Sequence, residues 1–301
     1  MNKFTIAVPA STANIGPGFD SAGMALNKYL NVQVIEQETW EIENHSPLLP
    51  SVATYTDHFI YKVAKQIAEK YGKMLRACKL AIYSDIPLAR GLGSSASAVL
   101  AGIELANQLC SLSLTLEDKL KLATEIEGHP DNVAPVIFGG MVISAVMSHQ
   151  SIHYFQLPNL DLDTVVYIPN IELSTEAARS VLPNSFSRDD ATAASGISNL
   201  MIASLISGDY NLAGKMMEQD VFHEPYRAEL IPNYQMIKQE AKSQGAYGTV
   251  ISGAGPTMIS FVPRGQGTKI ASFMKEKLSD YEVDALVIDQ TGLQVHQDLI
   301  K

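Results

Sequence analysis

Hydrophobic residues recur along the chain with two spacings, one typical of helices and one typical of strands. The apolar positions of residues 55–71 fall on one helical face, and Gly72 follows as the expected C-terminal stop. Residues 4–8 and 25–36 are instead rich in Val, Leu and Ile. They predict a strand that stops at Pro9 and then a second strand or strand pair.

The same patterns divide the rest of the chain into strand pairs and helices. Thr115 and Asp118 have the spacing of a capping box, which predicts a helix that ends at Gly128. Further strands are expected at residues 77–82, 141–146, 152–157, 164–168, 247–252, 257–262 and 284–288. Further helices are expected at residues 95–110, 175–181, 190–206, 212–217, 234–243 and 268–278, with a short helical segment after residue 129. This order predicts an α+β fold rather than a regular βαβ series.

A domain boundary is expected near Pro158, which gives an N-terminal domain of residues 1–157 and a C-terminal domain of residues 158–301.

The length of 301 residues and the hydrophobic content of 46% suffice for a sizeable core. The net charge of −10 argues against nucleic-acid or anionic-membrane binding. The longest apolar runs fall short of the roughly 18 residues that span a bilayer. Two isolated cysteines and no leader pattern favour a cytoplasmic protein.

The segment IPLARGLGSSASAVLAG places glycines and serines directly before a predicted helix. A helix N-terminus offers unpaired backbone N–H groups, and glycines allow a ligand to approach the backbone closely. Hydroxyl groups that can donate to phosphate oxygens or coordinate Mg²⁺ are present on Ser94, Ser95 and Ser97. Arg90 adds a positive charge. The loop is neither a Walker A motif nor a GxGxxG fingerprint. From spacing alone, a phosphate site and a plain helix start capped by Ser94 or Ser95 both stay open.

Three blocks of the sequence resemble the GHMP kinases, a family of small-molecule kinases. PLARGLGSSAS is similar to the family's phosphate-binding motif, PASTANIGPGFD to its N-terminal motif and ISGAGPTMISF to its C-terminal glycine motif. The resemblance implies a two-lobed fold, with an N-terminal lobe like domain 2 of ribosomal protein S5 and a ferredoxin-like C-terminal lobe. It implies ATP and Mg²⁺ as cofactors, and it is compatible with a homodimer. The ATP-binding residues would be Pro87, Leu88, Ala89, Arg90, Gly91, Leu92, Gly93, Ser94, Ser95, Ala96 and Ser97.

Further segments resemble one branch of that family. The N-terminal motif lacks the Lys of mevalonate-type kinases, and GHPDNVAP and STEAARSVLP are similar to the branch that phosphorylates L-homoserine. The expected activity is therefore ATP-dependent phosphorylation of the L-homoserine side-chain hydroxyl, in threonine biosynthesis. A GHMP kinase for a sugar or an isoprenoid alcohol, or an inactive ligand-binding relative, is the alternative.

The resemblance and the chemistry of an amino-acid substrate together nominate a substrate site. Arginine binds a carboxylate with two donors in a fixed fork, which suits Arg179 and Arg227. Asn14 and Asp20 offer acceptors for an ammonium group. The full expected substrate-binding set is Asn14, Asp20, His129, Asp131, Thr175, Arg179 and Arg227.

The resemblance implies a Ser and a Glu as metal ligands, which are expected to be Ser95 and Glu127, with Glu125 as the alternative carboxylate. The expected catalytic residues are Asp131, Glu127 and Arg179. Asp131 is a candidate general base, although positioning and electrostatics without a base stay open, as does a helix-capping role for this carboxylate. For adenine, His58 is the nearest match to the Asn that many relatives carry at the start of the predicted helix of residues 55–71.

Overall fold

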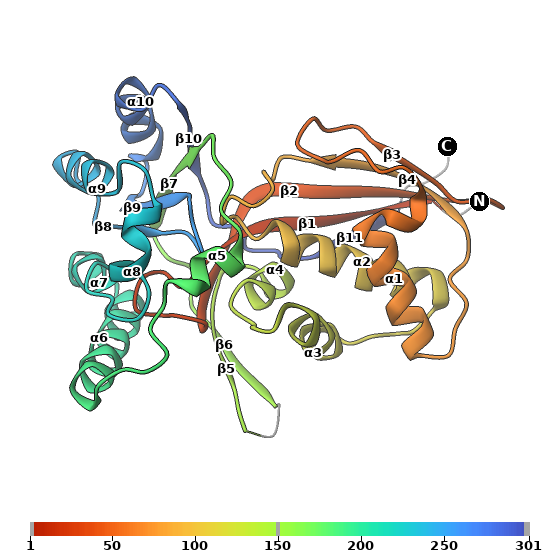
Figure 1. The fold of residues 1–301 in the computed structure, drawn as a ribbon, viewed down its shortest axis with the longest axis horizontal. Coiled ribbons are helices and arrows are strands. Elements are labelled where there is room, and N and C mark those ends of the chain that lie inside the picture. Colours follow the sequence, from red (N-terminus) through yellow and green to blue (C-terminus); the bar gives the residue numbers. More distant parts are fainter. Residues whose placement is uncertain (1–2, 149–150, 298–301) are drawn as a thin grey trace.

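Two sheets form the centres of the two lobes of the molecule (Figure 1). The computed structural model describes residues 3–148 and 151–297. The first sheet has seven strands in the order β11-β1-β2-β4-β3, with β5 also pairing with β2 and β6 pairing with β5. Its strands are β1 (Lys3–Ala13), β2 (Ala22–Glu36), β3 (Glu41–Asn44), β4 (Cys78–Ser84), β5 (Met141–Val146), β6 (Ile152–Gln156) and β11 (Gln294–Gln297).

Four α-helices and a short 3₁₀ turn belong to the first lobe. They are η1 (Tyr55–Asp57), α1 (Phe59–Lys70), α2 (Ser94–Cys110), α3 (Leu116–Glu127) and α4 (Val133–Phe138). Helix α2 is central, because it packs against β1 and also contacts α1, α3 and α4. Most of its length is buried, so the residues at its N-terminus are held firmly in place.

The second sheet has four strands in the order β10-β7-β9-β8, all antiparallel. They are β7 (Leu162–Pro169), β8 (Gly248–Ile251), β9 (Met258–Pro263) and β10 (Tyr281–Leu286). The helical elements of this lobe are α5 (Thr175–Ser180), α6 (Arg188–Ser207), α7 (Tyr210–Met217), α8 (Glu224–Arg227), η2 (Ala228–Leu230), α9 (Tyr234–Ser243) and α10 (Gly267–Lys277). The α+β architecture expected from the sequence is confirmed.

Several boundaries differ from those the sequence predicts. Strand β1 continues through Pro9 to Ala13, because an irregularity in the β1–β2 register between Pro9 and Ala10 accommodates the missing N–H. The predicted helix of residues 55–71 is divided at His58, which has an extended backbone. Strand β10 lies earlier than the predicted residues 284–288. Elements β3, β11 and α8 were not predicted.

The last strand returns to the first lobe. Strand β11 pairs antiparallel with β1, with Phe4 opposite Gln297. The domain boundary near Pro158 stays a prediction, but the sheet membership of β11 shows that the C-terminal strand belongs with the N-terminal sheet. Among the described residues, no helix combines the length and apolarity that a membrane crossing requires.

Candidate active site

A cavity of about 480 Å³ is lined by residues of both lobes. It brings together most of the residues nominated from the sequence, which come from the β1–β2 loop, the glycine loop, the α3–α4 segment, α5, α8 and the β8–β9 loop. Its lining residues are Asn14, Phe19, Asp20, Ala89, Gly91, Gly93, Ser94, Ser95, Ala96, Ile126, Glu127, His129, Asp131, Asn132, Leu173, Ser174, Thr175, Arg179, Arg227, Gly253, Ala254 and Gly255.

The glycine loop reaches α2 through two glycines in the left-handed region. Gly91 has φ 78° and Gly93 has φ 70°. A Cβ on Gly93 would stand 2.0 Å from the Ser11 Oγ, and one on Gly91 would stand 2.3 Å from the Ser252 carbonyl oxygen. Both positions therefore require glycine for space as well as for conformation. The N-cap of α2 is Gly93 and no side chain caps the helix, so capping by Ser94 or Ser95 is wrong.

The remaining residues of the predicted ATP motif have different surroundings. Pro87 and Leu92 are buried. The Ser97 hydroxyl donates to the carbonyl oxygens of Pro9 and Gly93, at 2.8 and 3.1 Å, inside the fold. Arg90 Nη1 lies 3.8 Å from the Glu172 carboxylate. These four side chains do not line the main cavity, in contrast to Ser94 and Ser95.

A second cavity of about 300 Å³ lies beside the glycine loop and is mostly apolar. Leu88, Ala89, Ser94 and Ser95 form the side that it shares with the loop. His58 lines it as well, and burial lowers the pKa of this imidazole. Within the described part of the chain, the buried His58 Nδ1 has no hydrogen-bond partner.

Helix α3 ends at the carboxylate expected to bind metal. Its N-terminal capping box of Thr115 and Asp118 is confirmed, and it stops at Gly128. The Ser95 hydroxyl donates to Glu127 Oε1 over 2.6 Å. Burial raises the pKa of Glu127, and the Ser95 hydrogen bond opposes that shift. The alternative carboxylate, Glu125, is exposed and forms an ion pair with Lys70 at 2.6 Å. It does not line the cavity that Glu127 lines.

Asp131 is 2% exposed and lies at the wall of the cavity. Its Oδ1 is 2.6 Å from His129 Nδ1 and accepts from the Asn132 backbone N–H over 2.9 Å. The hydrogen bond to Asp131 raises the pKa of His129, which opposes the effect of burial. The N-cap of α4 is Asn132, so Asp131 bonds the chain just before that helix without being its N-cap.

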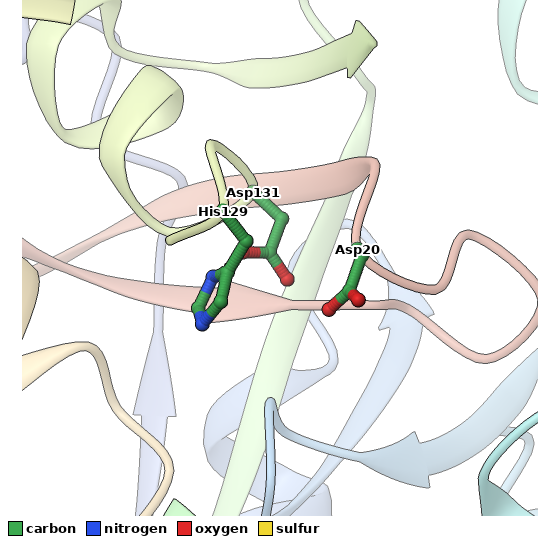
Figure 2. A group of neighbouring side chains, drawn as sticks. All are labelled: Asp20, His129 and Asp131. Carbon is green, nitrogen blue, oxygen red and sulfur yellow. The ribbon is translucent and has the colours of Figure 1, made fainter. Parts of the chain in front are cut away.

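Asp20 completes a group of three titratable side chains. Figure 2 shows Asp20 beside His129 and Asp131, with each side chain coming from a loop. One ligand atom from each of the three lies within 4.8 Å of the others. Asp20 is also joined to Arg179, with Arg179 Nη2 at 2.6 Å from Oδ1 and Nη1 at 3.3 Å from Oδ2. This forked ion pair connects the two lobes across the cavity.

The loop that carries Asp20 has an unusual backbone. Asn14, Ile15 and Asp20 have φ values of 69°, 50° and 53°, a region that non-glycine residues rarely occupy. The Asn14 side chain accepts from the Asp20 N–H over 3.0 Å and donates to the Gly253 carbonyl over 2.8 Å. Asn14 therefore bridges the N-terminal motif to the C-terminal glycine motif. Strained backbone of this kind persists where surrounding contacts determine it and is typical of functional sites.

Arg227 is 1% exposed and lies on the second-lobe side of the cavity. Its Nε donates to the Ala178 carbonyl over 3.0 Å, and its Nη1 is 3.2 Å from His223 Nδ1. Burial, followed by the nearby charge of Arg179, lowers the pKa of this guanidinium to about 10. Among the described residues Arg227 forms no ion pair with a carboxylate, so its charge is free to attract an anionic ligand.

Sequence reasoning missed two aromatic rings at this site. The Phe19 ring lies 5.6 Å from the Arg179 guanidinium carbon and 5.4 Å from that of Arg227. The second ring is the imidazole of His223, which stacks on Phe19 with centroids 5.3 Å apart. Phe19 belongs to the motif PASTANIGPGFD and was visible there, whereas no local signal marks His223.

The arrangement suits a phosphorylated nucleotide with a hard cation and a small zwitterion. The first residues of α2 line the cavity and no side chain caps this helix, so its N-terminal backbone N–H groups are available to an anion. The Ser95 hydroxyl and the Glu127 carboxylate are oxygen donors, which Mg²⁺ prefers. The residues at this end of the cavity therefore fit both the phosphates of a nucleotide and a bound Mg²⁺ ion.

Comparisons with known proteins agree with these features. The model described as the GHMP kinases N terminal domain matches residues 58–140, and the model described as GHMP kinases C terminal matches residues 201–280. A homoserine kinase of Oceanobacillus iheyensis is 52% identical over 99% of this chain and 100% of its own length. A homoserine kinase of Bacillus licheniformis is 44% identical over 98% of this chain and 96% of its own. The crystal structure of a homoserine kinase from Cytophaga hutchinsonii has a TM-score of 0.84 at 29% identity and covers 98% of both chains.

Proposed function

Because the chain belongs to the GHMP kinase family, we propose that it transfers the γ-phosphoryl group of ATP to the side-chain hydroxyl of L-homoserine. The products are ADP and O-phospho-L-homoserine. One observation carries the proposal: a single cavity is lined both by the uncapped N-terminus of α2 and by Arg227, a buried guanidinium with no carboxylate partner in the described chain. The first feature suits phosphate and the second suits the carboxylate of an amino acid.

The nucleotide would bind along the glycine loop. The backbone N–H groups of Ser94, Ser95 and Ala96 would donate to phosphate oxygens, assisted by the positive end of the helix dipole. The neighbouring apolar cavity would receive the adenine ring, since it is continuous with the loop through Ser94 and Ser95. The unpartnered Nδ1 of His58 is available there for a hydrogen bond with the base.

L-Homoserine would bind between the two lobes. Arg227 and Arg179 would attract its carboxylate, and Phe19 would hold the two guanidinium planes in place through cation–π contacts. The carboxylate of Asp20 and the amide oxygen of Asn14 would accept from its ammonium group, and Thr175 lines the same region. A neutral polyol would leave Arg227 buried without an anion, which disfavours a sugar as substrate.

Ser95 and Glu127 would hold Mg²⁺, which neutralises phosphate charge when it is bound. Glu127→Gln should raise the Mg²⁺ concentration needed for half-maximal activity and lower kcat by roughly 10²-fold. Glu125→Gln is the matched control, because Glu125 pairs with Lys70 on the surface. Equal effects of the two substitutions would remove Glu127 from the metal site.

The transfer forms a bond between the homoserine oxygen and the γ-phosphorus and breaks the bond from that phosphorus to the β,γ-bridging oxygen. The hydroxyl proton must leave. Both hydrogen bonds to Asp131 use Oδ1, so Oδ2 is the oxygen through which this carboxylate would accept it. Alternatively Asp131 only orients the hydroxyl, and the proton leaves through phosphate or solvent.

A coupled assay of ADP release with a panel of alcohols tests the proposal. We expect turnover with L-homoserine and little with mevalonate, galactose or D-homoserine, because only L-homoserine offers a carboxylate, an ammonium and an alcohol in the right arrangement. Faster turnover of mevalonate or galactose would reassign the substrate, and ATP binding without turnover of any alcohol would indicate an inactive relative. A role in threonine biosynthesis, a cytoplasmic location and a homodimer stay predictions.

A further inference from the structure

His223 is a fully buried histidine that contacts the substrate-binding residues without lining the cavity. It precedes α8, the short helix that carries Arg227, and it stacks on Phe19. Its two ring nitrogens contact two different parts of the site. Nδ1 lies 3.2 Å from Arg227 Nη1, and Nε2 lies 3.0 Å from the Gly16 carbonyl oxygen.

These two partners fix the proton of the imidazole. A guanidinium N–H can only donate, so Nδ1 must accept. A carbonyl oxygen can only accept, so Nε2 must carry the hydrogen and donate. The Asp220 Oδ2 atom lies 3.7 Å from Nε2, beyond hydrogen-bond distance, and already accepts from the backbone N–H groups of His223 and Glu224. His223 is therefore the neutral Nε2–H tautomer.

The Gly16 carbonyl belongs to the strained loop that carries Asn14 and Asp20. Gly16 itself has φ 67°, and a Cβ there would stand 2.1 Å from the Met217 carbonyl oxygen, so this loop lies directly against the end of α7. The hydrogen bond from His223 links the same loop to the start of α8. One imidazole thus connects the acceptors for the substrate ammonium with an arginine for its carboxylate.

We propose that His223 is a positioning residue for L-homoserine, which holds Arg227 and the residue 14–20 loop at the separation that one amino-acid substrate requires. This inference rests on the proposed function, because it takes Arg227, Asn14 and Asp20 as substrate ligands. The nucleotide site lies on the glycine loop, whereas the side chain of His223 contacts Gly16, Arg227 and Phe19. The residue should therefore affect homoserine binding and leave ATP binding unchanged.

Three substitutions separate the two hydrogen bonds. His223→Phe keeps a ring to stack on Phe19 and removes both bonds. In His223→Asn the amide oxygen takes the place of Nδ1 and can accept from Arg227, whereas in His223→Gln the amide nitrogen takes the place of Nε2 and can donate to Gly16. His153→Asn and His153→Gln are matched controls, because His153 is exposed on β6.

We expect His223→Phe to raise the KM for L-homoserine by roughly tenfold or more, the effect of losing a hydrogen bond to a charged group. His223→Asn and His223→Gln should each recover part of that loss, and the KM for ATP should stay within about twofold in all three variants. A lowered melting temperature with unchanged KM for L-homoserine would overturn the proposal, as would equal increases in both KM values.

Nitrogen-15 NMR of the intact protein tests the tautomer independently of the substrate. The expected result is a neutral imidazole with its proton on Nε2, assigned by the signal that disappears in His223→Asn. A proton on Nδ1 would overturn the proposal whatever the substrate proves to be. Failure of the wild-type protein to turn over L-homoserine, with the Nε2–H tautomer present, would instead count against the proposed function.

Discussion

The two walls of the cavity differ in origin and in chemistry. The wall assigned to the nucleotide comes from one continuous segment, residues 89–96, whose donors are backbone N–H groups and hydroxyls. The members of this segment that line the cavity are Ala89, Gly91, Gly93, Ser94, Ser95 and Ala96. The wall assigned to the substrate combines charged side chains such as Asp20, Asp131 and Arg227, which lie far apart in the sequence. The comparison indicates that phosphate recognition is built locally into one loop, whereas amino-acid recognition depends on how the two lobes meet.

The nucleotide wall should be the more sensitive to a single added methyl group. Gly93→Ala places a Cβ 2.0 Å from the Ser11 Oγ at a φ of 70°, so the start of α2 must shift. We expect kcat/KM for ATP to fall by roughly 10²–10³-fold, the scale of losing preorganised donors. The measurement is the coupled assay at varied ATP.

Gly196→Ala is the matched control for that substitution. A Cβ on this exposed glycine of α6 meets nothing within 4 Å, so activity should be unchanged and the free energy of unfolding should rise by about 0.4–1 kcal/mol. Equal activity of Gly93→Ala and Gly196→Ala would contradict the assignment of the glycine loop.

Asp131→Asn tests whether the substrate wall performs proton transfer or only orientation. A general base removed in this way should lower kcat by about 10²-fold or more with little change in the KM for L-homoserine. Nearly normal kcat with a raised KM would instead assign Asp131 to positioning. Steady-state kinetics at saturating ATP separates the two outcomes.

Arg227→Lys tests the fork of donors on the substrate wall while the positive charge is retained. An ammonium group cannot reproduce the bonds that Arg227 makes to Ala178 and His223 and also hold two carboxylate oxygens. We expect the KM for L-homoserine to rise by roughly tenfold and the KM for ATP to be unchanged. Arg188→Lys, at an exposed position, is the control; a similar result in both variants would exclude Arg227 from substrate binding.

The pairing of His129 with Asp131 should make a smaller, pH-dependent contribution to stability. Because the folded protein raises the pKa of His129, the contribution is fully present below the unfolded value of about 6.5 and is lost as pH rises through the higher folded value. The loss of unfolding free energy in Asp131→Asn should therefore be largest near pH 6, at most about 1.5–3 kcal/mol, and shrink by pH 9. Urea unfolding at both pH values measures it; a loss that grows with pH would contradict the assignment.

The sequence revealed the nucleotide wall better than the substrate wall. The glycine loop lies within one segment, and its glycines, serines and following helix are visible together. Arg179 and Arg227 were nominated from family resemblance and the chemistry of the substrate, because no local pattern marks an arginine that faces a cavity. His223 was missed for the same reason, since its partner Gly16 is 207 positions away.

The fold shows the same division between local and distant information. The capping box at Thr115 and the stop at Gly128 depend on neighbouring residues and were predicted correctly. The passage of β1 through Pro9 depends on its pairing with β2, and the existence of β11 depends on its pairing with β1 at the other end of the chain. The hydrophobic pattern of one segment can indicate a strand, but it does not indicate which distant segment that strand pairs with.

A crystal structure with a non-hydrolysable ATP analogue, Mg²⁺ and L-homoserine tests the central claim most directly. We expect phosphate oxygens on the backbone N–H groups of residues 94–96, the metal between Ser95 and Glu127, and the homoserine carboxylate against Arg227 in the same cavity. Nucleotide bound away from α2, or homoserine bound with its carboxylate remote from both Arg179 and Arg227, would contradict it.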